Sequence, residues 1–303
     1  MPTETAAFWA VRAVSAVRYR FFLVAGLLPY LIGAAWAKSA LGVFAADRFA
    51  VGLLGVFFAV AGVEAFNEHY DAKLGTDRVF NPSDAETIPA FVLPLGWVAL
   101  ACAAACGVWL ARQVGWEVWG YALFGGFAAV FYVGPPLRLA YRGLGELTIG
   151  LAYGPGLMLG SVHLQAAHFV PQALPASLVL GLLLVALAVA NAIPDQLQDR
   201  LVGKRNLAVR LGPKRAVVLY ASLAFVAVAL LALTAAVGAG ALPLASTVAA
   251  AAGAVLVALS LREGRAHWDS PRQFVPAIRR IVLAYLVAAG GLLASLLVGR
   301  GAA

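Results

Sequence analysis

The chain has 303 residues, of which 63% are hydrophobic and 12% are charged. A soluble domain is typically about 45–50% apolar and about 25% charged, so half of the usual charge is missing. The length alone would permit two soluble domains, but the apolar segments leave little chain for even one. The composition therefore excludes an ordinary soluble protein and indicates an integral membrane protein.

The first 20 residues precede any apolar run. Apolar side chains recur at helical spacing in residues 6–20, with Arg12, Arg18 and Arg20 at other positions. This pattern predicts an amphipathic helix on the membrane surface. A cleaved signal peptide is the alternative, because Ala35-Trp36-Ala37 resembles a cleavage site. The apolar stretch before it is long for a signal peptide and contains Pro29, which favours a membrane span.

Nine apolar segments follow, and a bilayer-spanning helix takes about 20 mostly apolar residues. We predict an all-α, polytopic membrane protein with nine transmembrane helices around a central chamber, formed by a single domain over residues 1–303. The predicted spans are 21–37, 49–66, 88–111, 118–133, 147–164, 174–193, 216–237, 242–261 and 281–298.

The basic residues predict how the chain lies in the membrane. With a cytoplasmic N-terminus, eighteen of the 22 Lys and Arg fall on the cytoplasmic side, and four fall outside. Cytoplasmic loops of membrane proteins carry such an excess. We therefore expect a multi-pass protein of the cell (inner or plasma) membrane. The same asymmetry explains the net charge of +8, which is then no indication of nucleic-acid binding.

Acidic and amide side chains gather at the ends of the second and sixth predicted spans. The first group has Asn67, Asp71 and Asp77, and the second has Asn191, Asp195 and Asp199. Spacings of four residues place Asn67 and Asp71 on one helical face, and likewise the three residues of the second group. Pro194 is expected to bend the second helix. The two spans point the same way, so both groups are predicted at the cytoplasmic surface.

Two facing carboxylate clusters repel each other unless a cation lies between them. Mg²⁺ prefers oxygen ligands and usually binds through a few carboxylates together with substrate phosphates. Basic side chains beside the clusters fit a diphosphate, and they are Arg78, Arg138, Lys204 and Arg205. The alternative interpretation is that these are ordinary solvated charges in loops. Because two matched groups lie at one surface, this alternative is the weaker one.

These motifs resemble those of the UbiA superfamily of intramembrane prenyltransferases. The resemblance is carried by N-x3-D-x5-D from Asn67, by N-x3-D-x3-D from Asn191, by the segment 203–212 (GKRNLAVRLG) and by the segment 141–146 (YRGLGE). Gly75-Thr76-Asp77 and Ile193-Pro194-Asp195 are similar to the menaquinone branch, the 1,4-dihydroxy-2-naphthoate polyprenyltransferases. Glu68 and Asn206 depart from the residues common in the family.

The resemblance implies a role for each matched position. Asn67, Asp71 and Asp77, with Asn191, Asp195 and Asp199, would bind Mg²⁺ and the diphosphate of an isoprenyl donor, and Asp71 and Asp195 are the expected catalytic residues. Lys204 and Arg138 match positions that contact the diphosphate. The further candidates for contact with a substrate are Tyr132, Tyr141 and His69.

The implied reaction transfers a polyprenyl group to an aromatic acceptor, with loss of CO₂ in the menaquinone branch. Other acceptors stay open: 4-hydroxybenzoate, haem, chlorophyllide or a glycerol phosphate, as does a cyclase that uses no acceptor. A transporter would show ionisable groups near mid-membrane, and Glu64 is the nearest exception to their clustering at one surface. The paired motifs argue against a non-catalytic scaffold.

Overall fold

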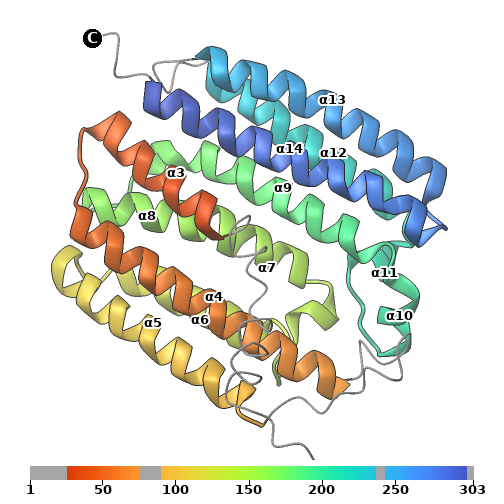
Figure 1. Cartoon of the computed structure of the whole chain (residues 1–303), viewed down its shortest axis with the longest axis horizontal. Coiled ribbons are helices and arrows are strands. Elements are labelled where there is room, and N and C mark those ends of the chain that lie inside the picture. Colours follow the sequence, from red (N-terminus) through yellow and green to blue (C-terminus); the bar gives the residue numbers. More distant parts are fainter. Residues whose placement is uncertain (1–25, 75–89, 237–242, 299–303) are drawn as a thin grey trace, which may run out of the picture.

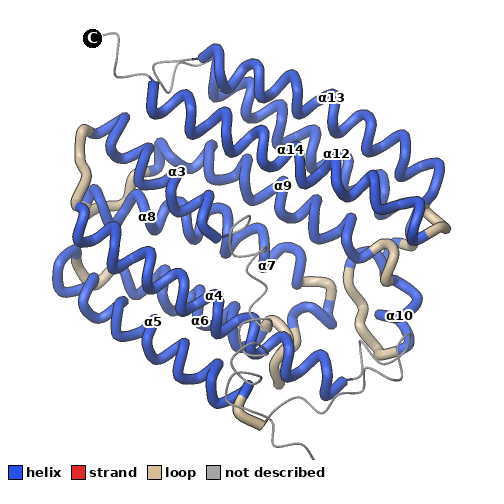
Figure 2. Tube along the Cα trace, in the orientation of Figure 1, coloured by secondary structure: helices blue, strands red, loops and turns tan. Residues whose placement is uncertain are grey.

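The computed structural model describes residues 26–74, 90–236 and 243–298, and these residues form helices and connecting loops without a strand (Figure 2). Seven of the helical stretches are long and apolar enough to cross a membrane. Seven rather than nine spans are thus found among the described residues: the helix at the predicted span 118–133 has only 14 residues, and the first five residues of the predicted span 21–37 lie outside the described part. The amphipathic helix predicted over residues 6–20 lies outside the described residues.

The N-terminal part of the bundle contains α3 (Leu28–Trp36), a π-helical segment (Ala37–Leu41), α4 (Ala46–Leu74), α5 (Val92–Val114) and α6 (Val118–Phe131). A 3₁₀ turn (Leu139–Arg142) precedes α7 (Gly145–Leu151), which continues through the π-helical segment η5 (Ala152–Gly156) into α8 (Leu157–Ala166). The C-terminal part contains a 3₁₀ turn (Pro171–Ala173), α9 (Leu174–Ala192), α10 (Gln196–Leu201), α11 (Leu207–Leu211), α12 (Pro213–Ala236), α13 (Pro243–His267) and α14 (Pro271–Val298).

Several helices are longer than the apolar segments that predicted them. Helix α4 continues to Leu74 although the predicted span ends at residue 66, and α14 begins ten residues before residue 281. Hydropathy marks only the part of a helix that fits the bilayer core, whereas backbone hydrogen bonding continues into the polar layer. Asn67 is therefore on a helix, not in a loop after it.

Prolines explain where several helices begin. Helices α12, α13 and α14 start at Pro213, Pro243 and Pro271. A proline at the first helical position loses no hydrogen bond, because that N–H has no partner within the helix, and its fixed φ suits helical geometry. Pro155 lies instead inside a helix, and the backbone around it adopts the π-helical form of η5.

The helices form one bundle in which neighbours along the chain often pack together. Helices α12, α13 and α14 form one side of the bundle, α4, α5 and α6 form the other, and α3, α7, α8 and α9 lie between them (Figure 1). The C-terminal end of α4, the start of α7, and α10 and α11 all lie at the same end of the bundle (Figure 1). This end, called the polar end below, carries the motif residues.

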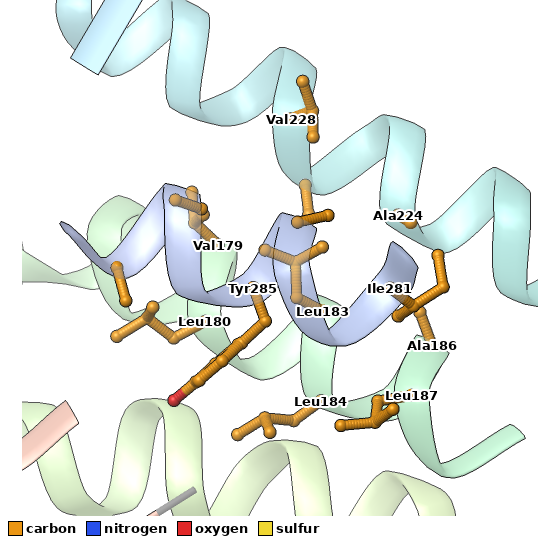
Figure 3. Packing of buried hydrophobic residues seen from close by; sticks show 14 of the residues in the cluster. Val179, Leu180, Leu183, Leu184, Ala186, Leu187, Ala224, Val228, Ile281 and Tyr285 are labelled. Atoms are coloured by element: carbon orange, nitrogen blue, oxygen red, sulfur yellow. The ribbon is translucent and has the colours of Figure 1, made fainter. Parts of the chain in front are cut away.

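Helix α9 forms the centre of the main apolar core. Its Val179, Leu180 and Leu183 are fully buried, and they pack with residues of α12 and α14 such as Ala224 and Tyr285 (Figure 3). The outer helices instead expose large apolar side chains, including Val98 and Leu123, as expected for surfaces that face lipid.

Close contact between α9 and the α7–η5 segment depends on glycine. A Cβ atom at Gly154 would lie 2.5 Å from the Cα of Gly181, and one at Gly150 would lie 2.2 Å from a methyl of Val185. The spacing Gly150-x3-Gly154 is interpreted as a helix-packing feature, because small residues let backbones approach closely. The contacts of Gly150 and Gly154 agree with this interpretation, and they fix one wall of the cavity described next.

Candidate active site

A cavity of about 760 Å³ lies among α4, α5, α6, α7, α8 and α9. Its volume is in the range of pockets that hold small organic ligands, about 300–1,000 Å³. One helical face of α4 lines it over about four turns, through Gly52, Gly55, Val56, Ala59, Val60, Val63, Glu64 and Asn67. Most of the wall is apolar, and the Asp, Asn and Lys side chains of the lining gather at the polar end, so the cavity suits a ligand with a polar head and a long apolar tail.

Helix α4 brings the first motif to the cavity. Asn67 lines it, and the Oδ1 atom of Asn67 is buried without a hydrogen-bond partner. Asp71 lies on the next turn of the same helix, where the side chain is outside the described part of the chain. Asp77 and Arg78 also lie outside it.

Helix α9 and the turn after it bring the second motif to the same cavity. Asn191, Asp195 and Asp199 all line it. The helix does not run continuously through them, because α9 ends at Ala192 and α10 begins at Gln196, with Pro194 in the turn between. The bend predicted at Pro194 is thus a complete break, and Asp195 has bridge-region backbone angles (φ −92°, ψ 0°), a region where many active-site residues occur.

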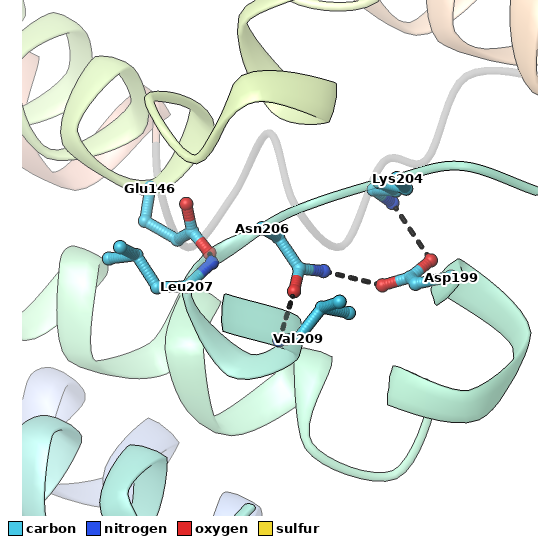
Figure 4. Close-up of polar contacts among 6 residues, drawn as sticks. All are labelled: Glu146, Asp199, Lys204, Asn206, Leu207 and Val209. Atoms are coloured by element: carbon cyan, nitrogen blue, oxygen red, sulfur yellow. Dashed lines mark hydrogen bonds and ion pairs between the residues drawn. The ribbon is translucent and has the colours of Figure 1, made fainter. Parts of the chain in front are cut away.

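Asp199 holds two polar side chains at the polar end (Figure 4). One carboxylate oxygen lies 3.3 Å from the Nζ of Lys204, and the other accepts a hydrogen bond from the side-chain amide of Asn206. The Oδ1 atom of Asn206 in turn accepts from the backbone N–H of Val209, which caps α11. Lys204 also lies 6.0 Å from the centre of the Tyr141 ring. Asp199 therefore positions Lys204. Among the described residues that line the cavity, Lys204 is the only Lys or Arg.

Glu146 ties this loop to the membrane helices. It is buried at the start of α7, lines the cavity, and accepts a hydrogen bond of 2.8 Å from the backbone N–H of Leu207. Two further hydrogen bonds join the same segments. The backbone N–H of Arg205 donates to the carbonyl of Tyr141, and the guanidinium of Arg210 donates to the carbonyl of Arg142. The loop that carries Lys204 is thus fixed against the segment 139–146.

The structure brings some of the predicted residues together and leaves others apart. Asn67, Asn191, Asp195, Asp199, Lys204 and Tyr132 line the cavity. Arg138, Arg205, Tyr141 and His69 do not line it. Arg138 has a left-handed backbone (φ 45°) before the 3₁₀ turn, and His69 packs against Tyr70. A contact of these residues with a cavity ligand therefore remains a prediction from the sequence.

The donor atoms at the polar end fit a divalent cation. They are carboxylate and amide oxygens, the ligands that Mg²⁺ prefers, and the Oδ1 of Asn67 is available to a ligand. Among the described residues, no three His, Cys, Asp or Glu side chains already form a metal-binding group. Asp71 and Asp77, whose side chains are not described, belong to the predicted ligand set.

Sequence reasoning left four cavity residues without a role. They are Glu64, Glu146, Tyr153 and Asn206. The position of Glu64, an ionisable residue inside an apolar span, could have indicated a functional role from the sequence. Glu146 acts through a contact with Leu207, which is distant in the sequence, whereas the contacts of Asn206 with Asp199 and Val209 are local. Tyr153 has no distinctive pattern around it.

The structure is thus a bundle of long apolar helices around an apolar cavity, with carboxylate and amide oxygens at one end of the cavity. This arrangement is that of an intramembrane enzyme. The UbiA prenyltransferase family model matches residues 26–275, and the chain belongs to that family.

Individual relatives are distant. The chain is 26% identical over 209 residues to the 2-carboxy-1,4-naphthoquinone phytyltransferase of a Synechocystis species, and 28% identical over 210 residues to the 1,4-dihydroxy-2-naphthoate octaprenyltransferase of Bacillus subtilis. Each match covers 66% of this chain and 66% of the relative, slightly less than two thirds of either. A UbiA homolog from Archaeoglobus fulgidus, solved with GPP and Mg²⁺, shares the fold with a TM-score of 0.62 at 17% identity, over 92% of this chain and 99% of the other.

Proposed function

We propose that this protein is a Mg²⁺-dependent prenyltransferase that transfers a polyprenyl group from an isoprenyl diphosphate to an aromatic acceptor, and that this acceptor is 1,4-dihydroxy-2-naphthoate in menaquinone biosynthesis. The observation that carries the proposal is the convergence of Asn67, Asn191, Asp195, Asp199 and Lys204 on one end of an apolar cavity. The UbiA homolog that contains GPP and Mg²⁺, and the two naphthoate-type relatives, support the substrate classes.

Each part of the cavity has a task in this reaction. Asn67, Asp71, Asp77, Asn191, Asp195 and Asp199 are the proposed Mg²⁺ ligands. Bound Mg²⁺ would neutralise the negative charge that develops on the diphosphate as it leaves. Lys204 adds a positive charge at the same place, and Arg78, Arg138 and Arg205 are the further diphosphate-binding candidates.

The apolar wall protects the reaction. When the allylic C–O bond breaks, the cation must meet an electron-rich aromatic carbon before it meets water. The apolar faces of α4 and α9 exclude water from that region and hold the prenyl chain. In this arrangement the acceptor lies next to the first carbons of the donor, just inside the polar end.

An acceptor panel tests the function. We expect purified protein with radiolabelled polyprenyl diphosphate to prenylate 1,4-dihydroxy-2-naphthoate faster than 4-hydroxybenzoate, and a chelator to abolish both reactions. A preference for 4-hydroxybenzoate, or for a glycerol phosphate, would refute the naphthoate assignment and leave the family intact. Turnover that survives full removal of divalent cations would refute the metal site.

Orientation is a separate prediction. We propose that the protein lies in the cell (inner or plasma) membrane with its polar end facing the cytoplasm. In the nine-span arrangement, eighteen of the 22 basic residues fall on that side. A cysteine at Gly212, in a background without Cys102 and Cys106, should resist an impermeant thiol reagent in intact cells. A cysteine at Lys38, on the predicted outer side, is the matched control and should react. Labelling of the Gly212 position from outside would overturn the orientation.

A further inference from the structure

A carboxylate lies deeper in the cavity than the proposed metal ligands. Glu64 is 4% exposed and lines the cavity on the same face of α4 as Asn67. The two residues are three positions apart, which is about 4.5 Å along the helix axis. Glu64 lies within the membrane span Ala46–Tyr70, where an ionisable group is costly and usually has a function.

The surroundings of Glu64 favour a hydroxylated ligand over an anionic one. The Glu64 carboxylate is close enough to Tyr153 to interact with it electrostatically, and Tyr153 also lines the cavity. Tyr153 belongs to the π-helical segment Ala152–Gly156, a distortion that is frequent at functional sites. Lys204 is the only Lys or Arg among the described residues around the cavity, and it pairs with Asp199 at the polar end. A carboxylate beside Glu64 would meet like charge, whereas a hydroxyl would donate to it.

The depth of Glu64 matches the place where the acceptor must lie. If the diphosphate is held at the level of Asn67, Asp195 and Lys204, the first carbon of the prenyl chain lies about one helical turn further in. The aromatic acceptor has to approach that carbon. We propose that Glu64 is the acceptor-binding residue: its carboxylate accepts a hydrogen bond from a ring hydroxyl of the acceptor, with Tyr153 beside it, and so orients the ring and raises its electron density.

This inference rests on the proposed function, because it takes a hydroxylated aromatic acceptor as given. It also specifies how that acceptor lies. The hydroxyl points toward Glu64, and any carboxyl group of the acceptor points away from it, because two buried anions side by side are unfavourable.

The test combines one protein variant with one change in the acceptor. The probes are 1,4-dihydroxy-2-naphthoate and its two monomethyl ethers, with geranyl diphosphate and Mg²⁺. In the wild type, the ether at the hydroxyl that Glu64 binds should lower kcat/KM about 10- to 100-fold, the usual effect of a lost hydrogen bond to a charged group. In Glu64→Ala the acceptor and that ether should react at nearly the same, reduced rate, because the two changes remove the same contact.

Two further measurements separate acceptor binding from a general structural role. In Glu64→Ala, the Tm and the affinity for geranyl diphosphate with Mg²⁺ should both stay close to wild type. If the alanine variant does not fold, Glu64→Leu replaces it, because leucine fills a similar space and has no hydrogen-bond acceptor. Glu68→Ala is the matched control, because Glu68 lies one turn further along α4 and does not line the cavity. It should keep the wild-type preference for the free hydroxyl.

The possible outcomes distinguish failure of the Glu64 proposal from failure of the proposed prenyltransferase function. If Glu64→Ala still discriminates against the ether as strongly as the wild type does, Glu64 does not bind the hydroxyl, and the prenyltransferase assignment is untouched. If the wild type itself prenylates neither the naphthoate nor 4-hydroxybenzoate, the aromatic-acceptor function fails, and the role of Glu64 fails with it.

Discussion

Asp195→Asn should lower prenyl transfer by about 10²–10³-fold, and by more if the metal is lost, while the protein stays folded. The substitution keeps the side-chain volume but removes a negative charge and a strong metal ligand. Asp195 is exposed in the turn between α9 and α10, so packing should change little. The defect should appear mainly in kcat, because the charge on the diphosphate develops as the C–O bond breaks. Asp71→Asn should have the same effect.

The measurement is turnover of labelled polyprenyl diphosphate over a range of Mg²⁺ concentrations. Both variants should need more Mg²⁺ than the wild type, and excess Mg²⁺ should restore part of the activity. Asp269→Asn is the matched control, because Asp269 is an exposed carboxylate that does not line the cavity. Near-normal turnover of both motif variants at saturating donor would show that these carboxylates do not form the metal site.

Lys204→Met should impair both the binding of the donor and the stability of the polar end. The Lys204 side chain is 24% exposed and lies 3.3 Å from the 8%-exposed carboxylate of Asp199. Its loss removes a positive charge from the diphosphate site, so the KM for the donor should rise about 10- to 100-fold. It also leaves Asp199 buried without its cation, which should lower the free energy of unfolding by about 1–3 kcal/mol.

Two independent measurements check these effects. Binding of inorganic diphosphate with Mg²⁺ reports the first, and the Tm reports the second. Lys214→Met is the matched control, because Lys214 lies 4.7 Å from the ring of Trp268 and does not line the cavity. Unchanged diphosphate binding in Lys204→Met would remove Lys204 from the site, and a Tm equal to wild type would show that the pair with Asp199 contributes little.

The sequence by itself determined the class of the fold and the position of the motifs along the helices. Hydropathy and helical spacing are local properties, so the predicted spans overlap helices wherever the structure describes them. The spacing of four residues between Asn191, Asp195 and Asp199 correctly indicated a common side, although a turn at Pro194 interrupts the helix. The nine-span count depends partly on residues outside the described part of the chain, and the orientation depends on the membrane. Both remain predictions.

Only the tertiary structure decided which side chains share the cavity and what each one contacts. Asp199 was predicted as a metal ligand, and the fold gives it two protein partners, Lys204 and Asn206. Glu146 accepts a hydrogen bond from Leu207, 61 residues away, and Glu64 and Tyr153 line the same cavity from different helical segments. Hydropathy and spacing describe one helix at a time. Contacts between helices depend instead on close approaches such as that of Gly154 to Gly181, which no periodic pattern within a single segment records.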